Sequence, residues 1–252
     1  MVSELGTSVK RKRHKHSCII LGMRSPQVRP PYVLAFCPRL EAERTLALPP
    51  ELRLRFSPKE LSELNALPER RRLDRVSGRL AAKRALAAHF SAEHGWQAEA
   101  RELAVFNDES GRPFLRLPKG APAPVPSFSI SHCVQGGAAA VAAPGRRVGV
   151  DVETVVARPA DVIAFVSAPS ELTGASPRDP EAQARLWTGK EAALKLFGLG
   201  LDADARDVRP GKEDVALYGE PAAAWRAAGS PRVRVAYERR EGAMLAVAYT
   251  GD

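Results

Sequence analysis

The chain has 252 residues, of which 44% are hydrophobic and 27% are charged, with a net charge of +9. These values exclude a wholly disordered chain, and the length is sufficient to bury a sizeable core in one large domain or two smaller ones. No apolar run approaches the roughly 20 residues of a membrane-spanning helix, so we expect no membrane segment.

The N-terminal extension, residues 1–30, carries most of the net charge. It holds seven Lys or Arg and one acid, which leaves 31 basic and 28 acidic residues in the rest of the chain. The basic run from Lys10 to His16 could bind nucleic acid or an anionic surface. Because little apolar sequence surrounds it, we expect instead a flexible, solvated segment outside the fold.

The cysteines are few and odd in number: Cys18, Cys37 and Cys133. They form neither a disulfide framework nor a motif with metal-ligand spacing. The apolar run Cys18–Leu21 is too short for a secretory signal. These features predict a cytoplasmic protein without structural disulfides.

Breaker residues divide the rest of the chain into two halves, residues 31–145 and 146–252. A Pro-rich connector lies within the first half at Pro118–Ser127, and a similar loop lies within the second at Ala168–Pro180. We expect each half to be an α+β unit, with the metal-binding and catalytic motifs in the second.

Helices and strands are predicted from composition and periodicity. Runs rich in Ala, Leu, Lys and Arg predict helices at Arg70–Phe90 and Gln183–Phe197. Apolar and β-branched runs predict strands at Pro126–Ser131, Ala138–Ala142, Val148–Glu153, Val233–Glu238 and Met244–Tyr249. The last two strands, joined by Arg239–Ala243, are predicted to form a hairpin.

Two short patterns recur in the same order in the two halves. Gly78–Ala82 resembles Gly189–Ala193, 111 residues later, and Gly136–Gly145 resembles Gly242–Gly251, 106 residues later. The similar offsets predict an α+β fold made of two similar halves related by a pseudo-two-fold duplication. Such a fold would place an active site at the interface between the halves.

Asp151 and Glu153 lie two residues apart on a predicted strand. Their side chains therefore point to one face, while Val150 and Val152 point to the other. Two adjacent carboxylates repel unless a proton or a cation lies between them, and oxygen ligands suit Mg²⁺ when phosphate supplies the remaining oxygens. The alternative is an exposed strand whose acids are simply solvated.

Glu191 and Lys195 lie one turn apart on the second predicted helix. On an isolated amphipathic helix such a pair contributes only about 0.2–0.5 kcal/mol. If the helix faces Asp151 and Glu153, however, the third acid and the ammonium group would complete a site for a metal ion and a phosphate.

His132 ends the predicted strand that contains Ser129 and Ser131. A histidine at a strand end can donate to an anion, although an incidental hydrogen bond is the ordinary role of such a residue. The sequence has no Gly-x-Ser-x-Gly elbow, and adjacent strand residues point apart, which excludes a His132–Cys133 dyad. It also lacks zinc-ligand spacing, a P-loop and a Gly-x-Gly-x-x-Gly loop.

The first predicted helix carries a stripe of basic residues at spacings of three and four: Arg72, Arg75, Arg79 and Lys83. A stripe of this kind can hold a phosphate-rich ligand or an RNA backbone. A solvated helix face is the alternative.

Taken together and in this order, the motifs resemble those of the surfactin-synthetase-type 4′-phosphopantetheinyl transferases. The resemblance covers about Arg70 to Leu201. It rests on Gly78-Arg79, Gly111-Arg112-Pro113-Phe114, Phe128-Ser129-Ile130-Ser131-His132, Gly149-Val150-Asp151-Val152-Glu153 and Trp187-Thr188-Gly189-Lys190-Glu191-Ala192-Ala193-Leu194-Lys195. It implies transfer of the phosphopantetheine arm of coenzyme A to a serine hydroxyl of an acyl or peptidyl carrier protein, with release of adenosine 3′,5′-bisphosphate.

The resemblance also implies roles for individual residues. Asp151, Glu153 and Glu191 would bind Mg²⁺, and Glu191 would also take the proton of the serine. Lys195 would be catalytic and would neutralise the pyrophosphate. The remaining contacts to coenzyme A are expected from Arg75, Arg79, Lys83, Arg112, His132 and Lys190. The loop residue Glu171 lies near a further metal-proximal acid of some relatives.

The expected partners are coenzyme A and apo carrier proteins of fatty acid, polyketide or nonribosomal peptide synthesis. A monomer is expected, because two fused halves complete one site without a second subunit. The sequence leaves two other functions open. The protein could be a nucleic-acid-binding module that uses the basic tail and the arginine-rich helix at Arg70–Phe90, or another CoA-dependent enzyme such as an acyltransferase.

Overall fold

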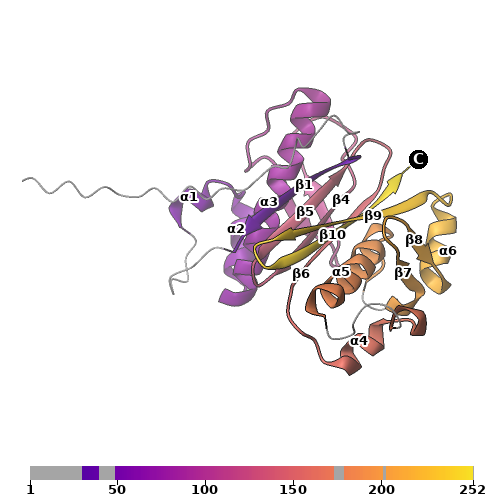
Figure 1. The fold of residues 1–252 in the computed structure, drawn as a ribbon. Coiled ribbons are helices and arrows are strands. Elements are labelled where there is room, and N and C mark those ends of the chain that lie inside the picture. The colour runs from indigo at the N-terminus through magenta and orange to yellow at the C-terminus, as the bar shows by residue number, and fades with distance from the viewer. Residues whose placement is uncertain (1–29, 40–48, 173–178, 201–202, 252) are drawn as a thin grey trace, which may run out of the picture.

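The computed structural model describes residues 30–39, 49–172, 179–200 and 203–251 (Figure 1). The predicted flexible extension, with its basic run and Cys18, lies outside the described residues. Within them, Cys37 and Cys133 are both free thiols. None of the helices found there is long and apolar enough to cross a bilayer.

The first half contains a strand, three helices and then four strands. Its elements are β1 (Tyr32–Pro38), α1 (Pro50–Arg53), α2 (Pro58–Asn65), α3 (Glu69–His94), β2 (Ala104–Asn107), β3 (Pro113–Arg116), β4 (Phe128–Cys133) and β5 (Gly136–Ala142). One antiparallel sheet has the order β1-β5-β4, and β2 pairs with β3 separately. The long helix α3 ends at Gly95, whose φ of 65° suits a left-handed helix cap.

The second half begins with a strand that carries the predicted acids. Its elements are β6 (Val148–Thr154), α4 (Ala160–Val166), the 3₁₀ helix η1 (Pro169–Leu172), α5 (Pro180–Leu196), the 3₁₀ helix η2 (Ala205–Asp207), β7 (Val208–Pro210), β8 (Val215–Leu217), α6 (Gly219–Ala227), β9 (Arg232–Arg240) and β10 (Ala243–Gly251). The main sheet has the order β6-β10-β9, and β7 pairs with β8. Glu241 and Gly242, with φ of 45° and 81°, form the predicted tight turn between β9 and β10.

The main elements of the two halves follow the same order. Each half has a first strand, a long helix, a short two-stranded sheet and then two further strands, and in each main sheet the last strand lies in the middle. The two patterns that recur in the sequence lie on matching elements, the glycine-led pattern on α3 and α5 and the alanine-rich pattern on β5 and β10.

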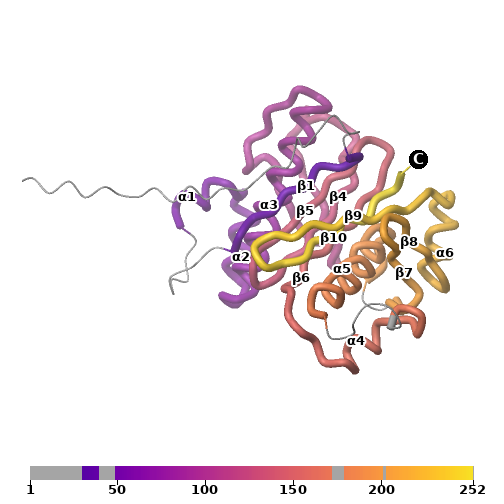
Figure 2. Tube along the Cα trace, in the orientation of Figure 1, coloured from indigo at the N-terminus to yellow at the C-terminus, as the bar shows by residue number. Residues whose placement is uncertain are grey.

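Three hydrophobic clusters arrange these elements in layers (Figures 1 and 2). The first lies between α3 and the sheet of β1 and β5, and includes Leu80 and Val141. The second lies between the two main sheets and includes Phe36 and Val150. The third lies between α5 and the sheet of β9 and β10. The order helix, sheet, sheet, helix places β4 against β6 near the middle of the molecule.

Glycines allow each long helix to approach its sheet closely. A Cβ at Gly137 on β5 would strike the backbone of α3, and one at Gly149 on β6 would strike the carbonyl oxygen of Ala192 on α5. The helix that carries Glu191 therefore lies directly on the strand that carries Asp151.

Replacing Gly149 with Ala is expected to destabilise the fold by about 3 kcal/mol, because the added methyl group meets backbone atoms that cannot rotate away. Urea unfolding monitored by circular dichroism measures this change. Gly200→Ala is the matched control, because an added Cβ there meets nothing within 4 Å. Equal midpoints for the two variants would contradict the close approach of α5 to β6.

Candidate active site

The alternating side chains of β6 divide between two environments. Val150 and Val152 lie in the cluster between the sheets, whereas the residues at 149, 151 and 153 face α5. The side chain of Asp151 is almost fully buried, with 3% of its surface exposed. The alternative of a strand with solvated acids therefore does not apply to Asp151.

A network of three side chains joins the two halves at Asp151. Lys195 Nζ, on α5, donates to Asp151 Oδ1 at 2.6 Å and to Ser131 Oγ at 3.2 Å. Ser131 Oγ, on β4, donates to the same Asp151 oxygen at 2.7 Å. A further bond from the Val150 amide to Ser129 Oγ, 3.1 Å long, connects β4 with β6. Side chains thus join these two strands where no backbone ladder does.

Glu191 and Glu153 complete the acid cluster, which we define as Asp151, Glu153 and Glu191. Burial first, and then the charges of Asp151 and Glu153, raise the pKa of Glu191 to about 7, although Lys195 opposes the shift. Burial and the charge of Asp151 also raise the pKa of Glu153, against the opposing effect of Arg158. The Arg158 guanidinium binds Glu153 Oε2 at 2.8 Å. The three acids are therefore close enough to repel one another.

The donor chemistry of the acid cluster fits Mg²⁺. Asp151 Oδ2 is buried and has no hydrogen-bond partner among the described residues, and a buried acceptor of this kind requires a cation or another donor. All three acids offer the oxygen ligands that Mg²⁺ prefers. In the described part of the chain, however, no group of three or more acidic, histidine or cysteine side chains lies close enough together to hold a metal ion.

A cavity of about 160 Å³ opens beside this cluster. We call it the arginine cavity; its walls are formed by Arg75, Gly78, Arg79, Asn107, Gly111, Pro113, Ile130 and His132. Ser131 and His132 point to opposite faces of β4, but His132 in the cavity wall interacts electrostatically with Lys195 and Asp151, so the cavity lies near the acid cluster. The structure thus brings together Arg75, Arg79 and His132, which the sequence predicted to bind coenzyme A.

The arginine cavity contains unsatisfied positive groups. Arg79 is only 4% exposed, and its Nη2 binds Glu63 Oε2 at 2.9 Å. Its Nε and Nη1 atoms are buried without a hydrogen-bond partner among the described residues. Burial and the charge of Arg79 together lower the pKa of Arg75, whose Nη1 donates to Asn107 Oδ1 at 2.6 Å. An anion in the cavity would relieve both the missing bonds and the repulsion.

His132 lies on the exposed side of the arginine cavity. Desolvation by the surrounding walls lowers its pKa, and the charges of Arg75 and Lys195 act in the same direction, while Asp74 and Asp151 oppose them. The ring can therefore serve as a neutral hydrogen-bond donor at physiological pH, and a bound anion would favour its charged form.

The structure places Lys83 and Lys190 outside the arginine cavity. Lys83 Nζ donates to Glu60 and to the carbonyl oxygens of Ala100 and Leu103. An ammonium group with three buried acceptors has no proton left for a phosphate. The expected contact to coenzyme A therefore does not fit Lys83. Lys190 Nζ likewise binds Glu171 and the carbonyl oxygens of Ala205 and Val208, but Lys190 also contributes to the wall of a second cavity beside Glu191.

The side chain of Arg112, which was expected to contact coenzyme A, does not line the arginine cavity either. Its neighbours Gly111 and Pro113 line the arginine cavity, but its Nη2 donates to the carbonyl oxygen of Gly198 at the end of α5. Arg112 therefore connects the β2–β3 sheet with the second half. As it stands, its side chain contributes to the contact between the halves and not to the cavity wall.

The basic stripe of α3 is not a solvated helix face. Arg72, Arg79 and Lys83 are all buried, with 6%, 4% and 2% of their surfaces exposed. The stripe therefore offers no continuous exposed surface for an extended nucleic-acid backbone, whereas the arginine cavity leaves room for one phosphate group beside Arg79. This environment argues against the alternative of a nucleic-acid-binding helix.

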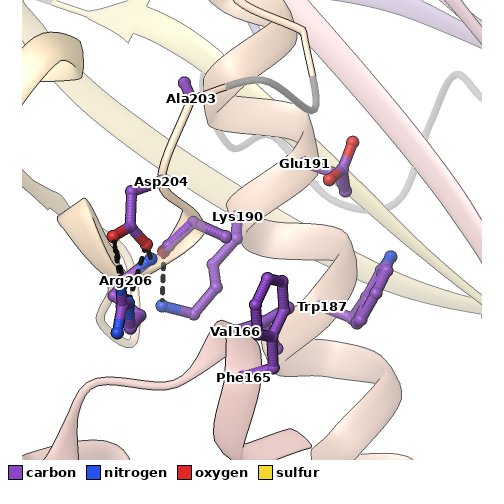
Figure 3. A pocket seen from close by; sticks show the side chains of 9 residues that line it. Phe165, Val166, Trp187, Lys190, Glu191, Ala203, Asp204 and Arg206 are labelled. Atoms are coloured by element: carbon purple, nitrogen blue, oxygen red, sulfur yellow. Dashed lines mark hydrogen bonds and ion pairs between the residues drawn. The ribbon is translucent and has the colours of Figure 1, made fainter. Parts of the chain in front are cut away.

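A second, larger cavity is lined in part by Glu191 (Figure 3). Its volume is about 380 Å³, and its lining includes Phe165, Trp187, Lys190, Glu191 and Arg206. The side chains of Lys190 and Glu191 leave α5 in different directions (Figure 3). The wall of this cavity contains more apolar side chains than that of the arginine cavity, among them Phe165, Val166 and Trp187.

Sequence reasoning did not assign roles to three residues that the structure places at the site. Ser131 belongs to the pattern that ends in His132, and its two-residue spacing from Ser129 indicates that both hydroxyls share a face. Asn107 and Arg158 have no comparable signal, because each is identified only by its partner, Arg75 or Glu153, in the folded chain.

No curated protein sequence matches the chain. Similar solved structures include a holo-ACP synthase from Plasmodium yoelii, with 21% identity over 42% of this chain and 96% of that chain, and a TM-score of 0.35. They also include an ACPS–CoA complex from Chronobacterium ammoniagenes, with 22% identity, 42% and 97% coverage and a TM-score of 0.35. A holo-[acyl-carrier-protein] synthase from Neisseria meningitidis has 19% identity, 42% and 98% coverage and a TM-score of 0.32.

The sequence model of the 4′-phosphopantetheinyl transferase superfamily matches residues 147–232. This segment begins just before β6 and includes Asp151, Glu153 and Glu191, together with Lys195. The part of the chain that carries the acid cluster is therefore similar in sequence to the 4′-phosphopantetheinyl transferase superfamily.

Proposed function

We propose that the protein transfers the 4′-phosphopantetheine arm of coenzyme A to a serine hydroxyl of an acyl or peptidyl carrier protein and releases adenosine 3′,5′-bisphosphate. The observation that carries this proposal is the arginine cavity beside the acid cluster. His132 in the cavity wall interacts electrostatically with Asp151 and Lys195, and Lys195 and Ser131 donate hydrogen bonds to Asp151. The superfamily match over residues 147–232 supports the same reaction.

The arginine cavity would bind the 3′-phosphate of coenzyme A. Arg79 has two buried N–H groups directed at no acceptor among the described residues, and Arg75 and His132 add donors on the same wall. Charge-assisted bonds from a guanidinium group to phosphate are among the strongest that proteins form. These residues would fix the nucleotide end and leave the pyrophosphate near His132 and Lys195.

The acid cluster and Lys195 would act on the pyrophosphate. Asp151, Glu153 and Glu191 would hold Mg²⁺, which, when bound, offsets the negative charge that develops on the leaving phosphate. The Lys195 ammonium group, 30% exposed and hydrogen-bonded to Asp151, would neutralise a pyrophosphate oxygen. Phosphoryl transfer depends mainly on such positioning and charge stabilisation.

Glu191 would act as the general base. Because its pKa is raised to about 7, the carboxylate can accept a proton from the serine hydroxyl near neutral pH. The serine oxygen then bonds to the phosphorus that bears the pantetheine arm. The bond from that phosphorus to the bridging oxygen breaks, and the electron pair leaves with adenosine 3′,5′-bisphosphate.

We further infer that residues 31–145 and 146–252 repeat one α+β plan as a pseudo-two-fold duplication, with the active site between them. The shared order of elements and the shared order of strands support this inference. So does the position of the recurring sequence patterns on matching elements. In this arrangement the first half would bind the nucleotide and the second would supply the metal ligands and the base.

The direct test is incubation of the protein with coenzyme A, Mg²⁺ and a panel of apo carrier proteins, followed by intact-mass measurement. The expected result is a mass gain equal to one phosphopantetheine on at least one carrier. A gain equal to an acyl group alone, with acyl-CoA as donor, would identify an acyltransferase instead. An unchanged mass on every carrier, with the protein folded, would contradict the proposal.

Replacing Arg79 with Gln is expected to raise the KM for coenzyme A by about 10- to 100-fold, because charged hydrogen bonds to the 3′-phosphate are lost. Dephospho-coenzyme A, which lacks that phosphate, should be used equally well by the variant and the wild type. The control is Arg84→Gln, which removes an arginine from α3 outside the lining of the arginine cavity. An Arg79 variant that still prefers coenzyme A to its dephospho form would contradict the assignment.

A further inference from the structure

Two buried lysines, one in each half, are held in the same way. In the first half, Lys83 Nζ on α3 pairs with Glu60 on α2, with 1% and 0% of the two side chains exposed. The remaining donors of Lys83 bind the carbonyl oxygens of Ala100 and Leu103, at 2.9 and 2.6 Å. We call Lys83 and Glu60 the first clamp.

The second half repeats this arrangement. Lys190 Nζ on α5 pairs with Glu171 of η1 at 2.8 Å, with 1% and 12% of the two side chains exposed. Its other donors bind the carbonyl oxygens of Ala205 and Val208, which are three residues apart, as are the two carbonyl groups of the first clamp. We call Lys190 and Glu171 the second clamp.

The glutamates of the two clamps also resemble each other locally, because each accepts a hydrogen bond from a backbone amide three residues earlier in its own segment. Glu60 Oε2 accepts the amide of Ser57 at 2.8 Å, three residues earlier. Glu171 Oε2 accepts the amide of Ala168 at 2.7 Å, also three residues earlier. Each carboxylate is therefore fixed to its own short segment before it reaches the lysine on the long helix.

Each clamp lies next to a different part of the proposed site. Glu63, one turn after Glu60 on α2, holds Nη2 of Arg79, and Arg79 lies one turn before Lys83 on α3. The first clamp therefore ties together the two helices that position the arginine cavity. Lys190 directly precedes Glu191, so the second clamp fixes the rotation of α5 at the proposed base.

We propose that the two clamps are positioning devices with separate tasks: Lys190 and Glu171 orient Glu191 for catalysis, and Lys83 and Glu60 orient Arg79 for nucleotide binding. This inference rests on the proposed function. Removing one partner of a buried ion pair is costly, whereas replacing both partners by uncharged groups of similar size is often nearly neutral for stability. The clamps would accordingly serve geometry more than stability.

Matched double variants separate the two tasks: Lys190→Met with Glu171→Gln, and Lys83→Met with Glu60→Gln. For the second-clamp variant, we expect kcat to fall by about 10- to 100-fold, since a misplaced catalytic group costs this much, while the Kd for coenzyme A stays nearly unchanged. For the first-clamp variant, we expect the Kd to rise by a similar factor while kcat at saturating coenzyme A stays nearly unchanged. Steady-state kinetics and calorimetric titration with coenzyme A measure these quantities.

A purely structural role would not produce this division. If each variant changed kcat and Kd by the same factor, or if neither quantity moved, the proposal would be overturned. Should a double variant fail to fold, as judged by circular dichroism, Glu171→Asp and Glu60→Asp provide the same comparison, because each pair keeps both charges while the shorter carboxylate changes the position of the lysine. We again expect the second-clamp variant to lower kcat and the first-clamp variant to raise the Kd for coenzyme A, each by a smaller factor than in the double variants.

The same experiment distinguishes this inference from the proposed function. If the wild-type protein modifies no apo carrier, the proposed function is refuted. The calorimetric titration then remains as the test of the clamps: the first-clamp variant should lose affinity for coenzyme A, and the second-clamp variant should keep it. An active wild-type protein with equal effects in both variants refutes only the clamps.

Discussion

Asp151→Asn is expected to lower kcat by about 10²- to 10³-fold, the loss typical when a group that stabilises transition-state charge is removed from an enclosed site. Asp151 contributes one oxygen to Lys195 and Ser131. Its other oxygen is buried without a partner among the described residues. An asparagine of the same shape removes the charge and one acceptor, so Lys195 loses its ion-pair partner and the proposed Mg²⁺ would lose a ligand.

The fold should tolerate this substitution. In the absence of Mg²⁺, removing the charge of Asp151 relieves its repulsion of Glu153 and Glu191 but also removes the ion-pair partner of Lys195, whose ammonium group is 30% exposed and can be solvated. We therefore expect the melting temperature without Mg²⁺ to stay close to that of the wild type. Added Mg²⁺ should raise the melting temperature of the wild type and leave that of the variant unchanged, because a ligand stabilises only the state that binds it.

Differential scanning fluorimetry with and without Mg²⁺, together with carrier modification followed by intact mass, checks both parts. Asp161→Asn is the control, since Asp161 is an exposed acid in the first turn of α4. Near-normal turnover by Asp151→Asn would refute the metal role. If Mg²⁺ raised the melting temperatures of the wild type and of Asp151→Asn equally, Asp151 would not be a ligand of the metal ion.

Local patterns were sufficient to predict the elements that carry the site. The two-residue alternation of β6 correctly predicts that Asp151 and Glu153 oppose Val150 and Val152. The long helices and the hairpin of β9 and β10 lie close to their predicted ranges. These elements have strong periodicity or a decisive turn, and both signals are contained in a short stretch of sequence.

The missed elements are short or weakly patterned. β2 and β3 have four residues each, and β7 and β8 have three, too few for an alternation to be recognised. β1 is an apolar run without clear alternation, because its two faces contact α3 on one side and the second sheet on the other. A strand buried on both faces has no polar half to mark its period.

The roles of the basic residues could not be predicted because their partners are distant in the chain. Arg79 and Lys83 belong to the same stripe, yet Arg79 faces the arginine cavity while Lys83 is enclosed by Glu60 and two carbonyl groups. Their spacing is the same whether the helix is solvated, binds a phosphate or is packed against α2. Only tertiary contacts decide among these environments.

Glu191→Gln is expected to reduce turnover at pH 8 by about 10²- to 10⁴-fold, the usual contribution of a general base. For the wild type, kcat/KM should rise with pH as Glu191 loses its proton, whose pKa without metal is about 7. Bound Mg²⁺ favours the charged carboxylate and lowers that midpoint. The variant has no such carboxylate, so its residual rate should lack this rising limb.

The same shift predicts an effect on stability with a definite sign. The ordinary pKa of Glu191 is 4.5, and the fold raises it to about 7, so the folded protein binds a proton more tightly than the unfolded chain. Its contribution to stability is complete below pH 4.5 and is lost as the pH rises through 7. In EDTA, the Gln variant should therefore exceed the wild type in stability by about 1–3 kcal/mol at pH 8.5, a range that allows for partial exposure of the side chain.

Urea unfolding in EDTA at pH 5 and pH 8.5 measures this difference, most of which should disappear at the lower pH. Glu220→Gln is the control, because Glu220 is an exposed acid at the start of α6. A Gln variant that is equally or less stable than the wild type at pH 8.5 would mean that the carboxylate of Glu191 is not held in a desolvated, negatively charged environment. In that case the acid cluster could not supply the base.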